Sequence, residues 1–505
     1  MLPTEVLLHG VSLSEEMQQV ELGDSRLTAR VQQVMEAMSM EPDKSYPDIF
    51  GDDSQLEGFY RLIRNPALSV DQVLAPHREQ TAERGRLVGQ VLAIHDTSEM
   101  AWPLREGRLR QNLCKLSNKR QGFHVHTTMV VSADGLRAPL GVVGLRPYAH
   151  ENGLADDAYA FWDREYGLYD CESDRWLESV NAADEALQGV ESVVHVMDRE
   201  GDFYGLLSPM QQQQDRFVIR AAQNRNVAQA SSEEQTKLFD ALRGQPVLAT
   251  RTVELSARND ANRPPAERKR FPARRQRSAK LQFRAVSVQL MRPKGRPELG
   301  QLPQSMSVNV VQAVEVDMPD GQQPVHWVLL TSEPIDTVQQ VLWVVDTYRS
   351  RWIIEEFFKA IGTGCGYNKR QLDSAQHLLI ALVLTLPVAW KLLVLRHLER
   401  QCPEAPALAA VSETQLMLLK DAVLKWSWSP EPTVGEVTGA IAKLGGHLKS
   451  NGRPGWLVLW RGYQELRQMQ LGWEAAMRQV QALLQEPDGL EAAKRMANTT
   501  RKQQK

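Results

Sequence analysis

Two apolar segments that are typical of β-strands each end in an aspartate. The segment VLAIHD ends at Asp96, and the segment VVHVMD ends at Asp198. An acid at the end of a strand can be held rigidly over a cleft, where its oxygens could bind a metal ion. Most aspartates in such places only cap a turn or a helix, so the pair alone is a weak indication of catalysis.

A third acid, Glu355, lies in the segment DTYRSRWIIEEFFKAIG, whose apolar spacing predicts a helix. At about 100° per residue, Tyr348, Arg351, Glu355 and Lys359 fall on one narrow face of this helix. The remaining surface contains an apolar face, which is formed by Ile353, Ile354, Phe357, Phe358 and Ile361.

Two interpretations of the polar face stay open on these residues alone. A solvated face needs no function, because an i,i+4 pair between Arg351 and Glu355 contributes only about 0.3 kcal/mol. Alternatively, an aromatic hydroxyl, two cations and an acid suit a phosphodiester beside a carboxylate-bound metal. Three acids on rigid elements are what two Mg²⁺ ions need, since hard cations prefer carboxylate oxygens and a metal pair supports phosphoryl transfer.

Regions of the chain with different helix and strand patterns must form the elements that position these residues. Residues 1 to about 75 are predicted to form small helices, of which the one in SQLEGFYRLIRNP stops at Pro66. From Arg86 the chain becomes rich in short strands, and residues 225–335 are mostly strand and turn. From Val338 onward the pattern is helical. This mixture of strands and helices predicts an α/β fold with more than one domain.

The composition of the 505 residues is that of a globular protein. It is 42% hydrophobic and 24% charged, which excludes collagen, general disorder and a disulfide-rich miniprotein. The four cysteines lie far apart without CxxC spacing, so we expect no structural zinc site and a reducing compartment. The first residues lack the features of a signal peptide, and the apolar run 378–390 is shorter than the roughly 20 residues that cross a bilayer. We therefore expect a cytosolic protein with a buried helix kinked at Pro387.

One basic tract stands out against a formal net charge of −3. Residues 263–284 contain nine basic side chains and one acid, Glu267, together with prolines that disfavour a regular helix. Such a loop or hairpin could neutralise a phosphate backbone, which makes nucleic acid the leading partner. A solvated loop without a partner is the alternative.

The chain resembles the cut-and-paste bacterial transposases of the IS-four, Tn-five-like group. The resemblance covers nearly the whole length, through LGDSRLTAR, YRLIRNP, IHDTSE, MDREGD, FVIR, HWVLLTSEP, YRSRWIIEEFFKAIGTGC and AKLGGHLKSNGRPGW. It implies an RNase H-like mixed-sheet core whose D-D-E metal triad is Asp96, Asp198 and Glu355. The long interval between Asp198 and Glu355 corresponds to the β-strand insertion of the family, here at about residues 225–335.

The family signature Y-x2-R-x3-E-x6-K falls on the polar helix face. The resemblance implies that Tyr348 and Arg351 hold the 5′ phosphate of the strand that is not transferred, and that Lys359 is a nearby DNA contact. The final lysine of the signature is replaced by Gly362. Lys369 or Arg370 could reach the same phosphate in its place.

Further DNA contacts follow from the same resemblance. Trp327 matches a tryptophan that stacks on a flipped base, although from the residues alone a core aromatic in a strand is the simpler interpretation. Arg220 matches another active-site arginine. Arg26 and Arg30 match residues that bind the transposon end, where arginine can contact phosphate or read guanine.

The resemblance implies a domain order and a reaction. Residues 1–75 would bind DNA ends, residues 76–400 would form the catalytic domain, and residues 401–505 would form a helical dimerisation domain. The protein would bind terminal inverted repeats of double-stranded DNA in the bacterial cytosol, associated with the nucleoid and not with a membrane, and pair two ends as a homodimer. With two Mg²⁺ ions, or Mn²⁺ in their place, it would cleave through a hairpin intermediate and join 3′ ends to target DNA.

Two other functions stay open. The change to Gly362 keeps a catalytically impaired protein possible, one that binds DNA ends and inhibits active copies. The second alternative is a stand-alone RNase H-like nuclease that hydrolyses DNA without strand transfer. The basic N-terminal helices and the Tyr348 and Arg351 pair would be superfluous to such a nuclease.

Overall fold

A computed structural model of the chain describes residues 16, 22–104, 108–167, 172–229, 235–255, 273–318, 324–448 and 452–484. The chain divides into two compact units, and each is described by itself. The first comprises Met1–Asn65, Lys359–Arg370 and Leu384–Lys505, and the second comprises Pro66–Phe358 and Gln371–Val383. The division into three domains at about residues 75 and 400 stays a prediction.

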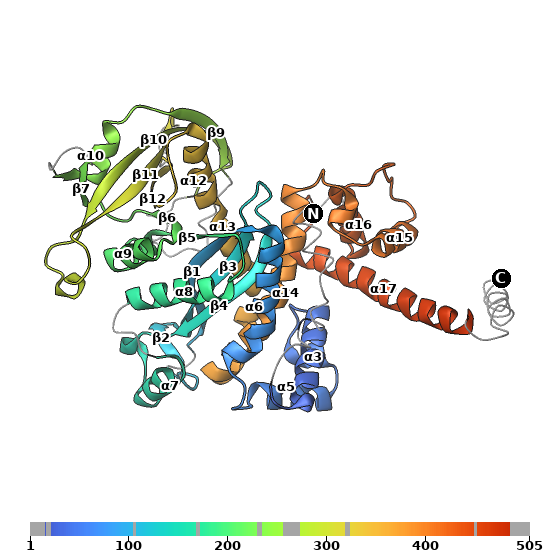
Figure 1. The fold of residues 1–505 in the computed structure, drawn as a ribbon. Helices are drawn as coiled ribbons and strands as arrows, with labels where there is room; N and C mark the ends of the chain where they lie inside the picture. Colours follow the sequence, from blue (N-terminus) through green and yellow to red (C-terminus); the bar gives the residue numbers. More distant parts are fainter. Residues whose placement is uncertain are drawn as a thin grey trace. The chain divides into compact units, whose positions relative to one another are not determined.

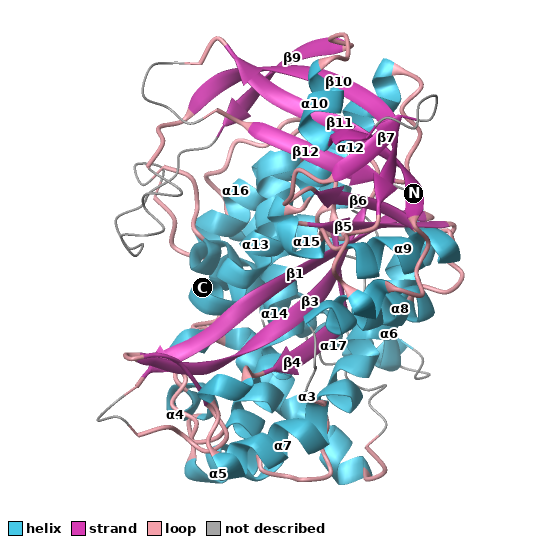
Figure 2. Ribbon diagram, turned by 90° about the vertical axis from the view of Figure 1, so that its left-hand side faces the viewer, coloured by secondary structure: helices cyan, strands magenta, loops and turns pink. Residues whose placement is uncertain are grey.

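A mixed β-sheet forms the centre of the second unit, in the order β4, β3, β1, β5, β6 (Figure 2). Strand β3 is antiparallel to β1 and β4, whereas β5 is parallel to β1 and β6. The short strand β2 (Cys114–Ser117) also pairs with β3. The bounds are β1 (Gln90–Pro103), β3 (Arg120–Ser132), β4 (Pro139–Tyr148), β5 (Ser192–Met197) and β6 (Arg216–Arg220).

The predicted strand-rich region 225–335 is confirmed in its described part, and it continues the central sheet. Strand β12 pairs antiparallel with β6, and β11 and β10 follow (Figure 1). The parallel core and the insertion therefore share one hydrogen-bonded sheet. The strands are β7 (Asn226–Gln229), β8 (Gln235–Lys237), β9 (Ala249–Leu255), β10 (Arg277–Met291), β11 (Ser305–Val316) and β12 (His326–Thr331).

Helices cover this sheet and supply its core. Helices α6 and α8 contact β4, and α12 contacts β6, β10, β11 and β12. The buried side chains include Leu206, Leu207, Phe217, Val310 and Leu330. The helices are α6 (Val70–Val88), α7 (Asp156–Tyr166), α8 (Glu172–Ala186), α9 (Tyr204–Gln213), α10 (Leu238–Arg243), α12 (Val338–Ser350) and α13 (Trp352–Lys359), with 3-10 turns at Glu151–Gly153, Arg199–Gly201 and Pro297–Leu299.

The expected end of a strand at Asp96 is wrong, because β1 continues to Pro103. The reason lies in its two neighbours. The parallel pairing of β1 with β5 stops at Ile94 and Val196, whereas the antiparallel pairing with β3 continues to the end of β1. Asp96 therefore lies just beyond the parallel pairing, where one edge of β1 has lost its partner.

The predicted single helix over residues 346–362 is divided at Arg351. Helix α12 ends at Ser350 and α13 begins at Trp352, with Arg351 itself in the right-handed helical region. The backbone N–H of Arg351 donates to the Tyr348 carbonyl at 3.1 Å, which is the tighter i to i−3 pattern. Beyond Lys359 the chain forms a π-helix at Ala360–Gly364, so the expected helix end at Gly362 is replaced by a wider turn.

The first unit is helical. The predicted N-terminal helices are confirmed in their described part, and Asp24 caps the first of them by accepting from the Arg26 N–H at 2.8 Å. Trp460 Nε1 donates to the Ser39 carbonyl at 2.6 Å and links this unit's N-terminal and C-terminal helices. Its helices are α3 (Ser25–Met40), α4 (Tyr46–Phe50), α5 (Asp53–Ile63), α15 (Glu413–Ala422), α16 (Val434–Leu444) and α17 (Trp456–Leu484), with 3-10 turns at Tyr367–Lys369 and Ala407–Ala409.

The expected apolar helix is part of α14 (Ala375–Gln401) and continues through Pro387. In the described part of the chain it is the one helix long and apolar enough to cross a membrane. All of its most apolar 18-residue window is buried inside the protein, as in the core helix of a globular fold.

Two glycines let α16 and α17 approach at backbone distance. A Cβ on Gly462 would lie 1.7 Å from the Ile441 carbonyl oxygen, and one on Gly445 would lie 2.0 Å from the Val458 carbonyl oxygen. The obstacle in each case is main chain, which cannot rotate away as a side chain can. This helix–helix contact therefore depends on glycine, which has no side chain, at both positions.

Gly462→Ala should destabilise the protein by roughly 1–3 kcal/mol, because the added methyl group forces the two helices apart. Urea unfolding monitored by circular dichroism measures the change. Gly472→Ala is the matched control on α17, since nothing lies within 4 Å of a Cβ there. The control should stabilise by about 0.5–1 kcal/mol through helix propensity. Equal shifts in both variants would contradict the proposed packing.

Candidate active site

The register of two parallel strands brings Asp96 and Asp198 to the same level. Ile94 on β1 is paired with Val196 on β5, and each aspartate lies two residues further along its strand. Asp198 directly follows β5 and caps the next 3-10 turn, where its Oδ1 accepts from the Glu200 N–H at 2.8 Å. The sheet thus holds both acids at one edge.

The side chain of Arg351 joins Glu355 to this pair of acids. Its Nη1 lies 2.6 Å from Asp96 Oδ2, and its Nη2 lies 2.5 Å from Glu355 Oε1. The side chains of Arg351 and Asp96 are each 14% exposed, and that of Glu355 is 31% exposed. One guanidinium therefore bridges two acids that come from β1 and α13.

The electrostatics of Asp96 reflect its burial first and the charges around it second. Burial raises the pKa of Asp96 to about 7, and the charges of Asp198 and Glu355 add to this rise, while Arg351 opposes it. Burial alone would lower the pKa of Arg351, but the charges of Asp96, Tyr348 and Glu355 hold it above its usual value. The acids need a nearby cation, and Arg351 supplies it.

The chemistry of the three acids fits divalent metal ions, because Mg²⁺ and Mn²⁺ prefer carboxylate oxygens. Within the described ranges, however, no three His, Cys, Asp or Glu side chains are grouped closely enough to hold an ion. The guanidinium of Arg351 lies between two of the expected ligands. Asp96, Asp198 and Glu355 could therefore hold metal ions only after this bridge opens.

Besides Arg351, three of the expected DNA contacts lie in the same unit as the acids. The ring of Trp327 on β12 meets that of Tyr348 at 5.6 Å between centroids and an angle of 64°. Tyr348 is buried and Trp327 is half-buried. Arg220 pairs with Leu329 on β12, and its Nη2 donates to the His326 carbonyl at 3.1 Å. Trp327 and Arg220 thus belong to adjacent strands.

Comparison with known families gives two matches. Residues 12–68 match the family described as Transposase DNA-binding, and residues 176–388 match the Transposase DDE domain. The chain carries both domains of a DDE transposase. The second match contains Asp198 and Glu355, whereas Asp96 precedes it.

The family match and the mixed sheet together confirm the α/β fold class, because a DDE domain implies an RNase H-like core. The match over residues 12–68 also supports DNA as a partner of the chain, whereas the roles of the individual arginines stay predictions.

Lys359, Arg26 and Arg30 belong to the other unit. Lys359 is the last residue of α13, one helical turn after Glu355, and is exposed. Arg26 is exposed near the start of α3. The guanidinium of Arg30 lies against Gly58 on α5, where a Cβ would be 2.3 Å from Nη1. Gly58 therefore leaves the space that the Arg30 side chain occupies.

Lys369 and Arg370, the two candidates to replace the signature lysine that is absent at Gly362, differ in exposure. Arg370 is buried and donates to the carbonyl groups of Pro42, Lys44 and Cys365, so it supports the fold of the first unit. It also stacks on the Tyr46 ring at 4.3 Å. Lys369 is exposed.

Of the basic tract, residues 263–272 lie outside the described residues, and most of the remainder forms the start of β10.

Sequence analysis missed Asp202, the second aspartate of the MDREGD segment. Its carboxylate is fully buried and accepts from the N–H groups of Ala222 at 2.6 Å and Gln223 at 3.2 Å. It also pairs with Arg225 at 2.8 Å. Asp202 therefore fixes the loop that follows Arg220 to the turn that follows Asp198. Its only signal in the sequence was its position four residues after Asp198.

A buried polar chain lies behind the acids and was also missed. His95 Nε2 and His195 Nδ1 are 2.9 Å apart, and His195 Nε2 lies 3.1 Å from Asp184 on α8. Thr128 on β3 hydrogen-bonds the other nitrogen of His95 at 3.0 Å. Because these residues come from β1, β5, β3 and α8, the chain fastens the strands that carry Asp96 and Asp198.

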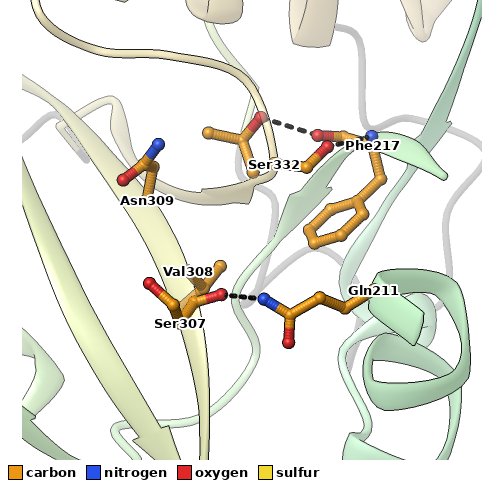
Figure 3. Close-up of a pocket in the computed structure, with 7 residues that line it drawn as sticks. Gln211, Phe217, Ser307, Val308, Asn309 and Ser332 are labelled. Atoms are coloured by element: carbon orange, nitrogen blue, oxygen red, sulfur yellow. Dashed lines mark hydrogen bonds between the residues drawn. The ribbon is translucent and has the colours of Figure 1, made fainter. Parts of the chain in front are cut away.

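A separate polar hollow of about 200 Å³ contains none of the predicted site residues (Figure 3). Phe217, three residues before Arg220, lines it, and Gln211 donates across it to the Ser307 carbonyl. Three residues of a strand span about 10 Å, so the hollow lies away from the Arg220 end of β6. Its lining is Gln211, Phe217, Ser307, Val308, Asn309, Thr331 and Ser332.

Asp202→Asn should lower the free energy of unfolding of the transposase by roughly 3–5 kcal/mol, because it leaves buried Arg225 without a full negative charge. Chemical denaturation measures the loss. Asp240→Asn removes an acid from an exposed pair with Arg243, so it should change stability by less than about 1 kcal/mol. A small effect in both variants would contradict the role of Asp202.

Proposed function

We propose that this chain is a cut-and-paste DNA transposase of the IS-four, Tn-five-like group, with Asp96, Asp198 and Glu355 as its metal-binding acids. The observation that carries the proposal is the Arg351 bridge between Asp96 and Glu355, beside Asp198 and at the end of the helix that bears Tyr348. Strands β1 and β5 and helix α13 supply one acid each. Two metal ions bound by these acids would activate an attacking oxygen and stabilise a leaving oxygen.

Arg351 would link DNA binding to the availability of the three acids for metal ions. A DNA phosphate, which is a singly charged phosphodiester before the strand is cut, accepts the same forked pair of N–H donors that Asp96 and Glu355 now share. When the phosphate of the strand that is not transferred binds Arg351, the acids would lose their compensating charge and become free for divalent cations. The protein would thus prepare its cleavage site only where a DNA end is present.

The remaining residues of the proposal contact DNA. Tyr348 would support the phosphate together with Arg351, and Lys359 would contact the same strand. Trp327 would exchange its contact with the Tyr348 ring for stacking on a flipped base, which any base can provide. Arg220 would bind near the cleavage point. Arg26 and Arg30 would bind the terminal repeat.

The protein would act on DNA in the bacterial cytosol, associated with the nucleoid, and its reaction would have several steps. Water first frees a 3′ hydroxyl, which attacks the opposite strand to form a hairpin. The hairpin is then opened, and the 3′ end joins target DNA. Two chains would pair two ends of double-stranded DNA in a homodimer, with the helices after residue 400 as the contact.

An inhibitor of transposition is the second candidate function, and Gly362 favours it. The side chain that would grip the phosphate is missing there, and Arg370 is committed to the carbonyl groups around it. Lys369, by contrast, is exposed. Such a protein would bind DNA ends without completing the hairpin step.

Incubation with Mg²⁺ and a labelled duplex that carries the element's terminal repeat should give nicks and then hairpins on a denaturing gel. Asp198→Ala should abolish both products and keep specific binding, since it removes one metal ligand. Nicks without hairpins would place the defect at the phosphate grip, and Gly362→Lys should then restore the hairpin. Specific binding with no cleavage would favour the inhibitor.

Arg351→Gln should raise the affinity of the DNA-free protein for Mn²⁺ by about tenfold, or roughly 1.4 kcal/mol, because the competing cation is gone. Electron paramagnetic resonance of free Mn²⁺ measures this affinity without any cleavage. Arg164→Gln, at an exposed arginine paired with Glu165, is the control and should leave the affinity unchanged. Unchanged affinity in Arg351→Gln would count against a bridge that blocks the acids.

A further inference from the structure

An ion pair joins the insertion to the helix that carries Tyr348. Arg251 on β9 holds Asp346 on α12 through two contacts, Nη1 to Oδ2 at 2.9 Å and Nη2 to Oδ1 at 2.6 Å. The forked guanidinium fixes the direction of the carboxylate as well as its distance. Strand β9 is joined through β10, β11 and β12 to the core sheet.

The Asp346 carboxylate also interacts with two other arginines. Arg349, one turn later on α12, lies 3.3 Å from the same carboxylate. Arg137, in the turn between β3 and β4, donates to the Thr347 hydroxyl at 3.5 Å and interacts with the charge of Asp346. Burial would raise the pKa of Asp346, but hydrogen bonding and charge from Arg251 and Arg349 lower it overall. The acid therefore stays ionised among three arginines.

The same helix touches the insertion sheet at a second point, two residues further on. There the ring of Tyr348 meets that of Trp327. Because successive residues point about 100° apart around a helix, the direction of the Tyr348 ring depends on how α12 is rotated about its axis. A rotation of α12 would therefore separate the two rings. It would also turn Arg351, which directly follows α12, away from Asp96.

We infer that Asp346 and Arg251 are positioning residues, which fix the rotation of α12 over the insertion sheet so that Tyr348 faces Trp327 and Arg351 reaches the acids. The inference rests on the proposed function, because the reaction it tunes is hairpin formation. The insertion strand thereby helps to set the geometry of the phosphate grip.

The exposure of this ion pair makes the inference testable. The side chains of Arg251 and Asp346 are 31% and 36% exposed, so solvent screens the pair and its loss should leave the chain folded. The effect should therefore appear in the position of the helix and in the later chemical step. Asp346→Glu keeps the charge and should preserve most of the function.

Asp346→Asn and Arg251→Gln should lower the ratio of hairpin to nicked product about tenfold, with nicking and DNA binding nearly unchanged. A 2-aminopurine at the base expected to flip should lose its fluorescence change in the same variants. Arg243→Gln is the matched control, since it removes an exposed ion pair within the insertion away from α12. An unchanged ratio in both test variants would overturn the inference, as would a parallel loss of nicks and hairpins.

Hydrogen–deuterium exchange of the DNA-free protein separates this inference from the proposed function. Asp346→Asn should increase exchange in α12, whereas Arg243→Gln should not. If the wild-type protein makes neither nicks nor hairpins, the proposed function fails, and the exchange result alone decides whether the ion pair holds the helix. Equal exchange in wild type and Asp346→Asn would overturn the positioning role.

Discussion

The guanidinium of Arg351 bridges two partly buried carboxylates, Asp96 and Glu355, and the geometry of the candidate site depends on this contact. Burial is the largest cause that raises the pKa of Asp96 to about 7, and the opposing charge of Arg351 does not cancel this rise. In the proposed function, metal ions would replace this cation between the acids, and a DNA phosphate would draw it away from them.

The rest of the second unit holds the elements that carry Asp96, Asp198 and Glu355 in place. Like charges repel, so the elements that carry them need support from behind. A hydrogen-bonded chain through His95 and His195 fastens β1 and β5, and Asp202 ties the turn after β5 to the loop after β6. The insertion continues the same sheet and holds α12 through Asp346. The candidate site is thus supported by polar contacts outside it, which are buried at His95, His195 and Asp202 and partly exposed at Asp346.

Local pattern and tertiary contacts contributed differently to what could be predicted from sequence. Apolar runs and helical spacing were sufficient to find the strands before Asp96 and Asp198 and the face that carries Arg351 and Glu355. The continuation of β1 past Asp96 was not predictable, because it depends on which neighbour still pairs there. Asp202 escaped notice for the same reason, since its partners lie about 20 residues later in the chain.

The most direct test of the metal site is backbone cleavage by Fe²⁺ bound in place of Mg²⁺, with ascorbate and peroxide. Radicals formed at the ion cut the nearest main chain, so mass spectrometry of the fragments maps the ligands without requiring transposition. The account predicts cuts near Asp96, Asp198 and Glu355, increased by a DNA end with a 5′ phosphate and lost in Asp198→Ala. Cuts elsewhere, or cuts at these three places that persist in Asp198→Ala, would contradict it.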